Sequence, residues 1–99
     1  MYGLSEEVIN EINEVFVKND FVKEVILYGS RAKETHTNGS DIDLAIKGDN
    51  ITLQQIFDIE NQLEDLDFLY KFDVHNYASI ANSDLLHYIN TTGKIFYSR

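Results

Sequence analysis

Two short stretches of this chain carry residue types that suit phosphate and metal-ion chemistry. The first is the pair Gly29-Ser30, and the second, ten residues later, is Asp41-Ile42-Asp43. Residues two apart in a β-strand project from the same face, so Asp41 and Asp43 are expected to place two carboxylates side by side. Neighbouring carboxylates repel each other, and a chain tolerates them most readily when cations bind between them. The pattern therefore predicts a divalent cation site beside a phosphate site.

A third carboxylate, Asp73, lies between the apolar residues Phe72 and Val74 and repeats the pattern later in the chain. If its strand neighbours the first, Asp73 joins Asp41 and Asp43, and three carboxylates can hold two Mg²⁺ ions about 3.5–4 Å apart. Magnesium suits such a site because it prefers a few carboxylate oxygens together with water and substrate phosphates. This arrangement is typical of in-line nucleotidyl transfer, in which Asp73 is also placed to receive the nucleophile's proton.

The residues at the phosphate end have distinct predicted tasks. Gly29 allows a sharp turn and close approach of a phosphate, and Ser30 opens a predicted helical turn whose N–H groups and hydroxyl can hold phosphate oxygens. Arg31 and Lys33 are the nearest positive charges in the sequence. Each either contacts phosphates or balances the acidic surface, and the second role is favoured for Lys33. The predicted nucleotide-binding residues are Gly29, Ser30 and Arg31.

Each of these signals has a simpler explanation when it stands alone. A lone Gly-Ser pair at a strand end is usually a turn, and a lone Asp-x-Asp is often a solvated strand face. The combination is far more specific, because strand, turn, second strand and third carboxylate must all coincide. His75 lies two residues beyond Asp73 and is a further candidate for contact with a nucleotide or an acceptor on the same face.

The hydrophobic pattern predicts the elements that must position these residues. Strands alternate with helices, which indicates an α/β sheet with helices packed on it. Helices are expected at 5–18, 52–66 and 84–92, and strands at 21–28, 41–47, within 68–76 and at 94–97.

Several finer details of these elements can also be predicted. Ser5 and Ser83 are expected to cap their helices, and Gly93 is expected to end the last helix in a left-handed conformation. The apolar end of the first strand indicates burial on both faces. The buried stripe of the middle helix is predicted to be Leu53, Ile56, Phe57, Leu63 and Leu66.

Composition limits the class of protein. The chain has 99 residues, 43% of them hydrophobic, which predicts a single domain over residues 1–99. It has no cysteine, no signal-peptide pattern and no apolar run of about 20 residues, so a cytoplasmic protein without a membrane span is expected. The 17 acidic and 8 basic residues give a formal charge of −9. This charge argues against direct nucleic-acid binding, and it suits either a basic protein partner or solubility alone.

The two motifs together resemble a known signature. Gly29-Ser30-Arg31-Ala32 with Ser40-Asp41-Ile42-Asp43-Leu44 is similar to the DNA polymerase β-like nucleotidyltransferase superfamily, and specifically to its minimal nucleotidyltransferase (MNT) branch. The resemblance covers nearly the whole chain. It implies a nucleotidyltransferase fold with a small mixed β-sheet flanked by helices, ATP as donor, and magnesium held by Asp41, Asp43 and Asp73.

The same resemblance implies a partner and a function. Proteins of this branch are commonly antitoxins that transfer AMP from ATP to a tyrosine of a HEPN ribonuclease toxin, near the active site of the nuclease. The 99 residues leave no room for an acceptor-holding domain, so the partner is expected to present its own tyrosine. One departure concerns Glu34, where the family often has glycine, and it predicts a different path for the loop 34–40.

Two other functions are compatible with the residues. A binding module would neutralise the partner by occlusion, without transfer. A small-molecule nucleotidyltransferase would label a free metabolite or drug without a partner, and it ranks well behind.

Overall fold

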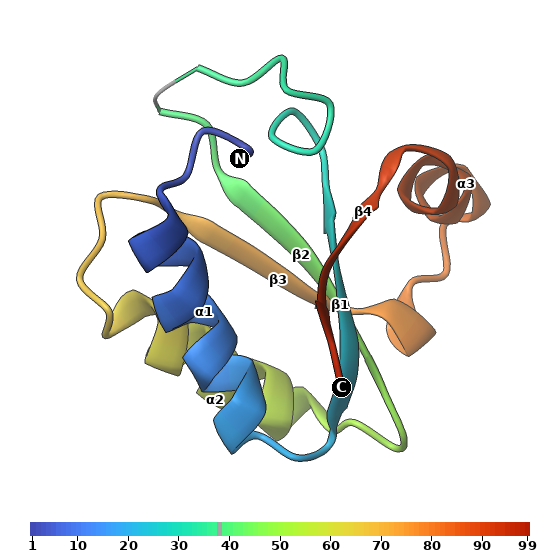
Figure 1. Cartoon of the computed structure of the whole chain (residues 1–99). Coiled ribbons are helices and arrows are strands. Elements are labelled where there is room, and N and C mark those ends of the chain that lie inside the picture. The colour runs from blue at the N-terminus through green and yellow to red at the C-terminus, as the bar shows by residue number, and fades with distance from the viewer. Residues whose placement is uncertain (38) are drawn as a thin grey trace.

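The computed structural model of the chain describes residues 1–37 and 39–99 (Figure 1). Its described part contains a four-stranded sheet in the order β3-β2-β1-β4, with helices on both faces. The elements are α1 (Glu6–Lys18), β1 (Val22–Tyr28), β2 (Ile42–Gly48), α2 (Leu53–Glu64), β3 (Phe72–Asn76), the 3₁₀-helix η1 (Tyr77–Ser79), α3 (Ser83–Thr92) and β4 (Lys94–Ser98).

The sheet is mixed. Strand β1 pairs antiparallel with β2 and with β4, whereas β2 and β3 run parallel. Helices α1 and α2 lie side by side on one face of the sheet, and α3 lies on the other (Figure 1). The predicted α/β class and the small mixed sheet flanked by helices are therefore confirmed. That residues 1–99 make one domain stays a prediction. None of the described helices is long and apolar enough to cross a membrane.

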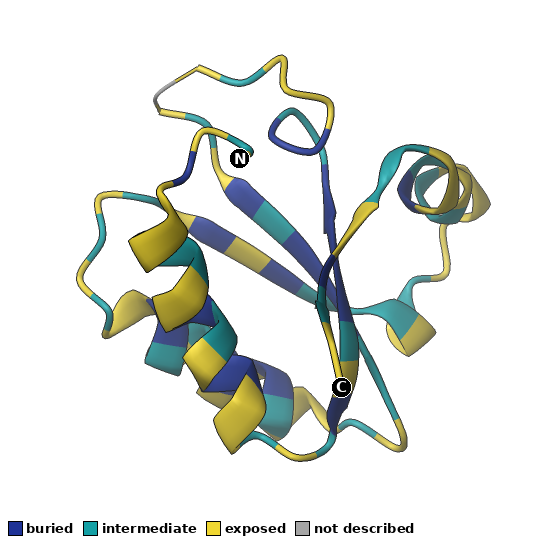
Figure 2. Cartoon of the chain, in the orientation of Figure 1, coloured by how far each residue is buried: buried dark blue, intermediate teal, exposed yellow. Residues whose placement is uncertain are grey.

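Strand β1 is buried on both faces, as its apolar sequence predicts. Val25 and Leu27 pack into the larger core beneath α1 and α2, and Ile26 and Tyr28 pack into a smaller core with Ile89 of α3. This burial covers residues 25–28, whereas Lys23 and Glu24 near the start of the strand are exposed and half-buried (Figure 2). The central position of β1 explains it, because helices cover both of its sides.

The helix starts follow side-chain capping. Ser5 Oγ accepts a hydrogen bond from the Val8 N–H at the start of α1, as predicted. Thr52 and Gln55 form a capping box at the start of α2. For α3 the predicted cap is wrong: Asn82, one residue before Ser83, accepts hydrogen bonds from the next turn.

Two details of the helices differ from the prediction. In α2, Leu53 and Phe57 are 68% and 48% exposed, and Leu66 is only half-buried beyond the helix end. The buried stripe consists of Ile56, Ile59 and Leu63, because this narrower row faces α1 and the sheet.

Gly93 is not left-handed. It has φ −69° and ψ 155°, because α3 passes directly into β4 and Gly93 already has extended backbone. A side chain there would collide with the carbonyl oxygen of Ile89 and with Ile26. The lack of space for a side chain therefore explains why this residue is glycine.

The segment after β1 forms one hydrogen-bonded turn and not a longer helix. The Lys33 N–H donates to the Gly29 carbonyl at 3.2 Å, and the Thr35 N–H donates to the Ser30 carbonyl at 2.9 Å. Between them, Glu34 adopts a φ of +59°. Position 38 of the predicted loop lies outside the described residues.

Candidate active site

The sheet register brings two of the predicted carboxylates together. Asp43 of β2 pairs with Asp73 of β3 across the parallel ladder, and with Tyr28 of β1 across the antiparallel one. We call Tyr28, Asp43 and Asp73 the acidic row. Asp41 precedes β2 by one residue and is exposed. The condition set for a shared carboxylate site, that the strands of Asp43 and Asp73 are neighbours, is thus met.

The acidic row lies on the α3 face of the sheet. The neighbours of Asp43 in β2, Ile42 and Leu44, are fully buried in the core under α1 and α2. The alternation of a strand therefore turns Asp43 to the opposite face. Phe72 and Val74 place Asp73 in the same way.

Electrostatic repulsion is concentrated at Asp43. Partial burial, followed by the charges of Asp73 and Asp41, raises the pKa of Asp43 from 3.8 to about 6, against a smaller lowering effect from His75. Burial, followed by the charges of Asp43 and Asp73, also raises the pKa of Tyr28 above its ordinary value of 10. A cation bound at the row would reverse the effect on Asp43 because it favours the ionised form.

His75 shares the face of the acidic row, as predicted. Its Nε2 atom lies 3.1 Å from Oδ1 of Asp73, and both side chains are about half exposed. His75 therefore borders the carboxylates two residues further along β3.

Position 29 requires glycine for two separate reasons. Its φ of +80° is a conformation that favours glycine, and a side chain there would overlap the carboxylate of Asp43. The backbone of the Gly29-Ser30 turn consequently lies directly against the acidic row. Ser30 is half-buried at the start of this turn.

The structure does not bring Arg31 to the acidic row, and its predicted contact with phosphates stays a prediction. Its side chain is only 1% exposed. Nε donates to the Ser40 carbonyl at 3.1 Å, Nη1 donates to the Tyr2 carbonyl at 2.9 Å, and the guanidinium lies 4.9 Å from the ring centroid of Tyr70. Tyr2 and Tyr70 pack against the core on the α1/α2 side. Arg31 thus ties the N-terminus to the loop that leads into β2.

Lys33 is the basic side chain of this turn that points to the α3 side. It is exposed, and its Nζ lies 5.7 Å from the ring centroid of Tyr88 on α3. The sequence analysis favoured charge balance for Lys33. The inward direction of Arg31 was missed because it depends on the carbonyls of Tyr2 and Ser40, which the residues next to Arg31 do not indicate.

The carboxylates of the acidic row, with Asp41, form an open set of possible magnesium ligands. Within residues 1–37 and 39–99, no group of three or more His, Cys, Asp or Glu side chains forms a compact metal cage. Asp43 and Asp73 form an open pair with Asp41 nearby, and all their donors are carboxylate oxygens. Such a set fits magnesium, which completes its shell with water and substrate phosphates.

Comparison with known proteins identifies the class. The model of the polymerase β nucleotidyltransferase family matches residues 10–99, and the chain belongs to this family. MJ1217 of Methanocaldococcus jannaschii, which is named provisionally as a protein adenylyltransferase, is 32% identical over 84 residues, covering 77% of this chain and 86% of that protein.

Two solved structures show the same fold. A chain in the crystal structure of a toxin–antitoxin with AMP-PNP has a TM-score of 0.75 and 23% identity, covering 92% of this chain and 73% of that chain. A chain in the complex of tri-AMPylated Shewanella oneidensis HEPN toxin with MNT antitoxin has a TM-score of 0.72 and 20% identity, covering 97% and 74%. The superfamily and fold predicted from the two motifs are confirmed.

Proposed function

We propose that this chain is a magnesium-dependent protein adenylyltransferase that transfers AMP from ATP to a tyrosine of a HEPN ribonuclease partner and thereby acts as its antitoxin. The observation that carries the proposal is the pairing of Asp43 with Asp73 directly beside the Gly29 turn. The name of MJ1217 supports protein adenylylation. The toxin–antitoxin structures with AMP-PNP and with a tri-AMPylated HEPN toxin support the donor and the partner. Because ATP is a cytoplasmic donor, we place the reaction in the cytoplasm.

Asp41, Asp43 and Asp73 are the residues that would hold magnesium. Bound there, two ions would lower the pKa of the attacking hydroxyl and neutralise charge on the leaving pyrophosphate. The raised pKa of Asp43 is consistent with this role, because its neighbours disfavour a carboxylate that has no cation partner.

The other residues of the site bind and orient the donor. The Gly29-Ser30 turn offers backbone N–H groups and a hydroxyl beside the acidic row, where the lack of a side chain at Gly29 gives the phosphates room. Lys33 supplies positive charge from the same turn. We assign Lys33 the phosphate contact that the sequence analysis gave to Arg31.

The proposed step is a displacement at the α-phosphorus of ATP. The tyrosine oxygen forms a bond to this phosphorus, the bond to the bridging oxygen of the β-phosphate breaks, and pyrophosphate leaves. The hydroxyl proton passes to the carboxylate of Asp73, which is about half exposed and lies beside His75.

The intact mass of the co-encoded HEPN protein tests the proposal. It is measured after incubation with ATP, magnesium and this chain, beside Asp41→Asn and Asp43→Asn controls. A gain of one or more adenylate units with the wild type alone is expected. An unchanged mass with a bound, inactive partner would instead establish neutralisation by binding. Labelling of a free small molecule without a partner would establish a small-molecule nucleotidyltransferase.

A further inference from the structure

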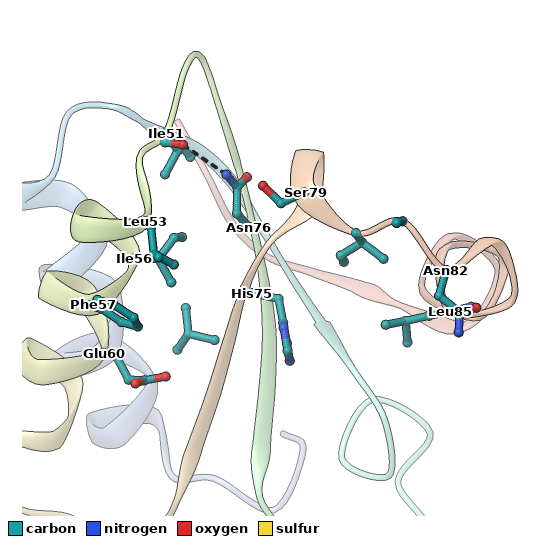
Figure 3. A pocket seen from close by; sticks show the side chains of 13 residues that line it. Ile51, Leu53, Ile56, Phe57, Glu60, His75, Asn76, Ser79, Asn82 and Leu85 are labelled. Carbon is teal, nitrogen blue, oxygen red and sulfur yellow. Dashed lines mark hydrogen bonds between the residues drawn. The ribbon is translucent and has the colours of Figure 1, made fainter.

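A pocket of about 410 Å³ lies beside β3, away from the Gly29 turn (Figure 3). One wall comes from α2, with Leu53, Phe57 and Glu60. The opposite wall comes from the segment that links β3 to α3, with Ser79, and from the start of α3, with Leu85. Asn76 Nδ2 donates to the Ile51 carbonyl at 3.1 Å and bridges the end of the pocket where β3 meets the loop before α2.

The pocket extends across the edge of the strand. Val74 packs in the core under α1 and α2, whereas His75 lies on the opposite face beside Asp73, and both line the same pocket. Successive residues of a strand point to opposite faces, so a cavity lined by both must lie along the outer edge. Strand β3 is the terminal strand of the sheet, and this edge has no strand partner within the described residues.

The sheet register shows which backbone groups face this edge. Ile42 is paired with Phe72, and its N–H donates to the Lys71 carbonyl at 2.8 Å. In a parallel ladder this register turns the backbone of alternate residues, 71, 73 and 75, towards β2. The N–H and C=O groups of Phe72 and Val74 therefore point outward. An unpaired row of this kind is a template for another strand.

Exposed apolar side chains flank the same edge. Leu53 and Phe57 are 68% and 48% exposed and lie four residues apart, so they form one continuous patch on α2. Glu60 continues this wall, and the chain carries a formal charge of −9. The pocket thus combines unpaired backbone, an apolar anchor and negative charge, which together suit an extended peptide with an apolar and a basic side chain.

We propose that the outer edge of β3 docks an extended segment of the acceptor protein, which seats an apolar side chain against Leu53 and Phe57. This inference rests on the proposed function. His75 lines the pocket and also lies beside Asp73 of the acidic row. A segment of the acceptor bound in the pocket would therefore extend to the site at which the tyrosine hydroxyl of the acceptor must react. A strand paired with β3 would lie about 4.8 Å from it. Residues of that segment opposite Asp73 would then lie beside the row.

Binding of the co-encoded HEPN protein to Leu53→Glu and Phe57→Glu tests the anchor, using titration calorimetry. We expect the dissociation constant to rise at least about tenfold for each variant, as for an interface hot spot. Both positions are exposed, and Leu53 is the first residue of α2, where an acidic side chain favours the helix. Val17→Glu is the matched control, because Val17 on α1 is 57% exposed and does not line the pocket. Unchanged affinity for both pocket variants would overturn the proposal.

Hydrogen–deuterium exchange tests the strand pairing. The Val74 amide should exchange more slowly in the complex than in the free chain, and an unchanged rate would contradict docking at the edge.

The pocket variants also test two other occupants of the pocket. A fall in their ATP affinity would assign the pocket to the nucleotide, and loss of self-association would assign it to a second copy of the chain. Asp43→Asn should keep partner binding and lose transfer, so failure of the proposed chemistry and failure of the docking surface are distinguishable.

Discussion

The two faces of the sheet carry different kinds of side chain, although the same strands contribute to both. Under α1 and α2, β2 contributes Ile42, Leu44 and Ile46, all fully buried. On the α3 face the same strand contributes Asp43, beside Asp73 and the buried Tyr28. One face gains stability from apolar burial, and the other holds carboxylates that repel each other. The comparison indicates that the first face holds the larger part of the apolar core, whereas the second combines a smaller core around Ile89 with the carboxylates of the acidic row.

Asp43→Asn should show the difference between the two faces most strongly, because it should affect AMP transfer and stability in opposite directions. We expect AMP transfer to fall by about 10³ or more, which corresponds to a loss of several kcal/mol of transition-state stabilisation. Without divalent cations, the variant should unfold at a higher temperature than the wild type at pH 7, because it lacks the repelled carboxylate. Mass spectrometry of the partner and thermal melts measure the two effects.

The pH dependence of the melts sharpens this prediction. The pKa of Asp43 is about 6 in the folded chain, above its ordinary 3.8, so the folded state binds the proton more tightly. The stabilising contribution of the protonated group is fully present below about pH 4 and is lost as the pH rises towards 6. Asp43→Asn should remove this part of the pH profile. A variant that melts below the wild type at pH 7 would contradict the assigned repulsion.

Leu44→Ala changes the neighbouring position on the opposite face. Leu44 is fully buried, so its truncation should lower the free energy of unfolding by about 2–5 kcal/mol. Transfer per folded molecule should stay close to that of the wild type, because the acidic row keeps its register. Urea unfolding gives the first quantity, and transfer assays at low temperature give the second. A loss of transfer as large as that of Asp43→Asn would show that the two faces are not separable.

Arg31 and Lys33 belong to one turn but differ in the same way as the two faces of the sheet: Arg31 is buried and supports the fold, whereas Lys33 is exposed on the α3 side. Arg31→Lys should lower the free energy of unfolding by about 1–3 kcal/mol, because the carbonyls of Tyr2 and Ser40 lose their fixed donors. Lys33→Ala should leave stability unchanged and weaken ATP binding roughly tenfold. Chemical denaturation and nucleotide titration of both variants measure these effects. The reverse pattern would restore the phosphate contact to Arg31.

The sequence predicts the site better than it predicts the side-chain directions around it. Alternation along β2 and β3 places Asp43 and Asp73 on one face, because a strand allows no other outcome once Ile42 and Val74 are buried. The direction of Arg31 is not contained in such a pattern. It depends on acceptors that lie far away in the sequence, chiefly the Tyr2 carbonyl. The exposure of Leu53 and Phe57 likewise depends on where α2 packs, which helical periodicity does not fix.

The smallest expected effect concerns Glu34, at the end of the same turn. Its φ of +59° is a left-handed conformation that costs a non-glycine residue roughly 1 kcal/mol. Glycine would adopt this conformation without that cost. Glu34→Gly should raise the free energy of unfolding by up to about 1 kcal/mol, less the entropy that glycine adds to the unfolded chain. Glu34→Ala is the matched control, because it removes the charge and keeps the side-chain β-carbon. Equal stability of the two variants would show that charge, and not backbone conformation, determines the effect at this position.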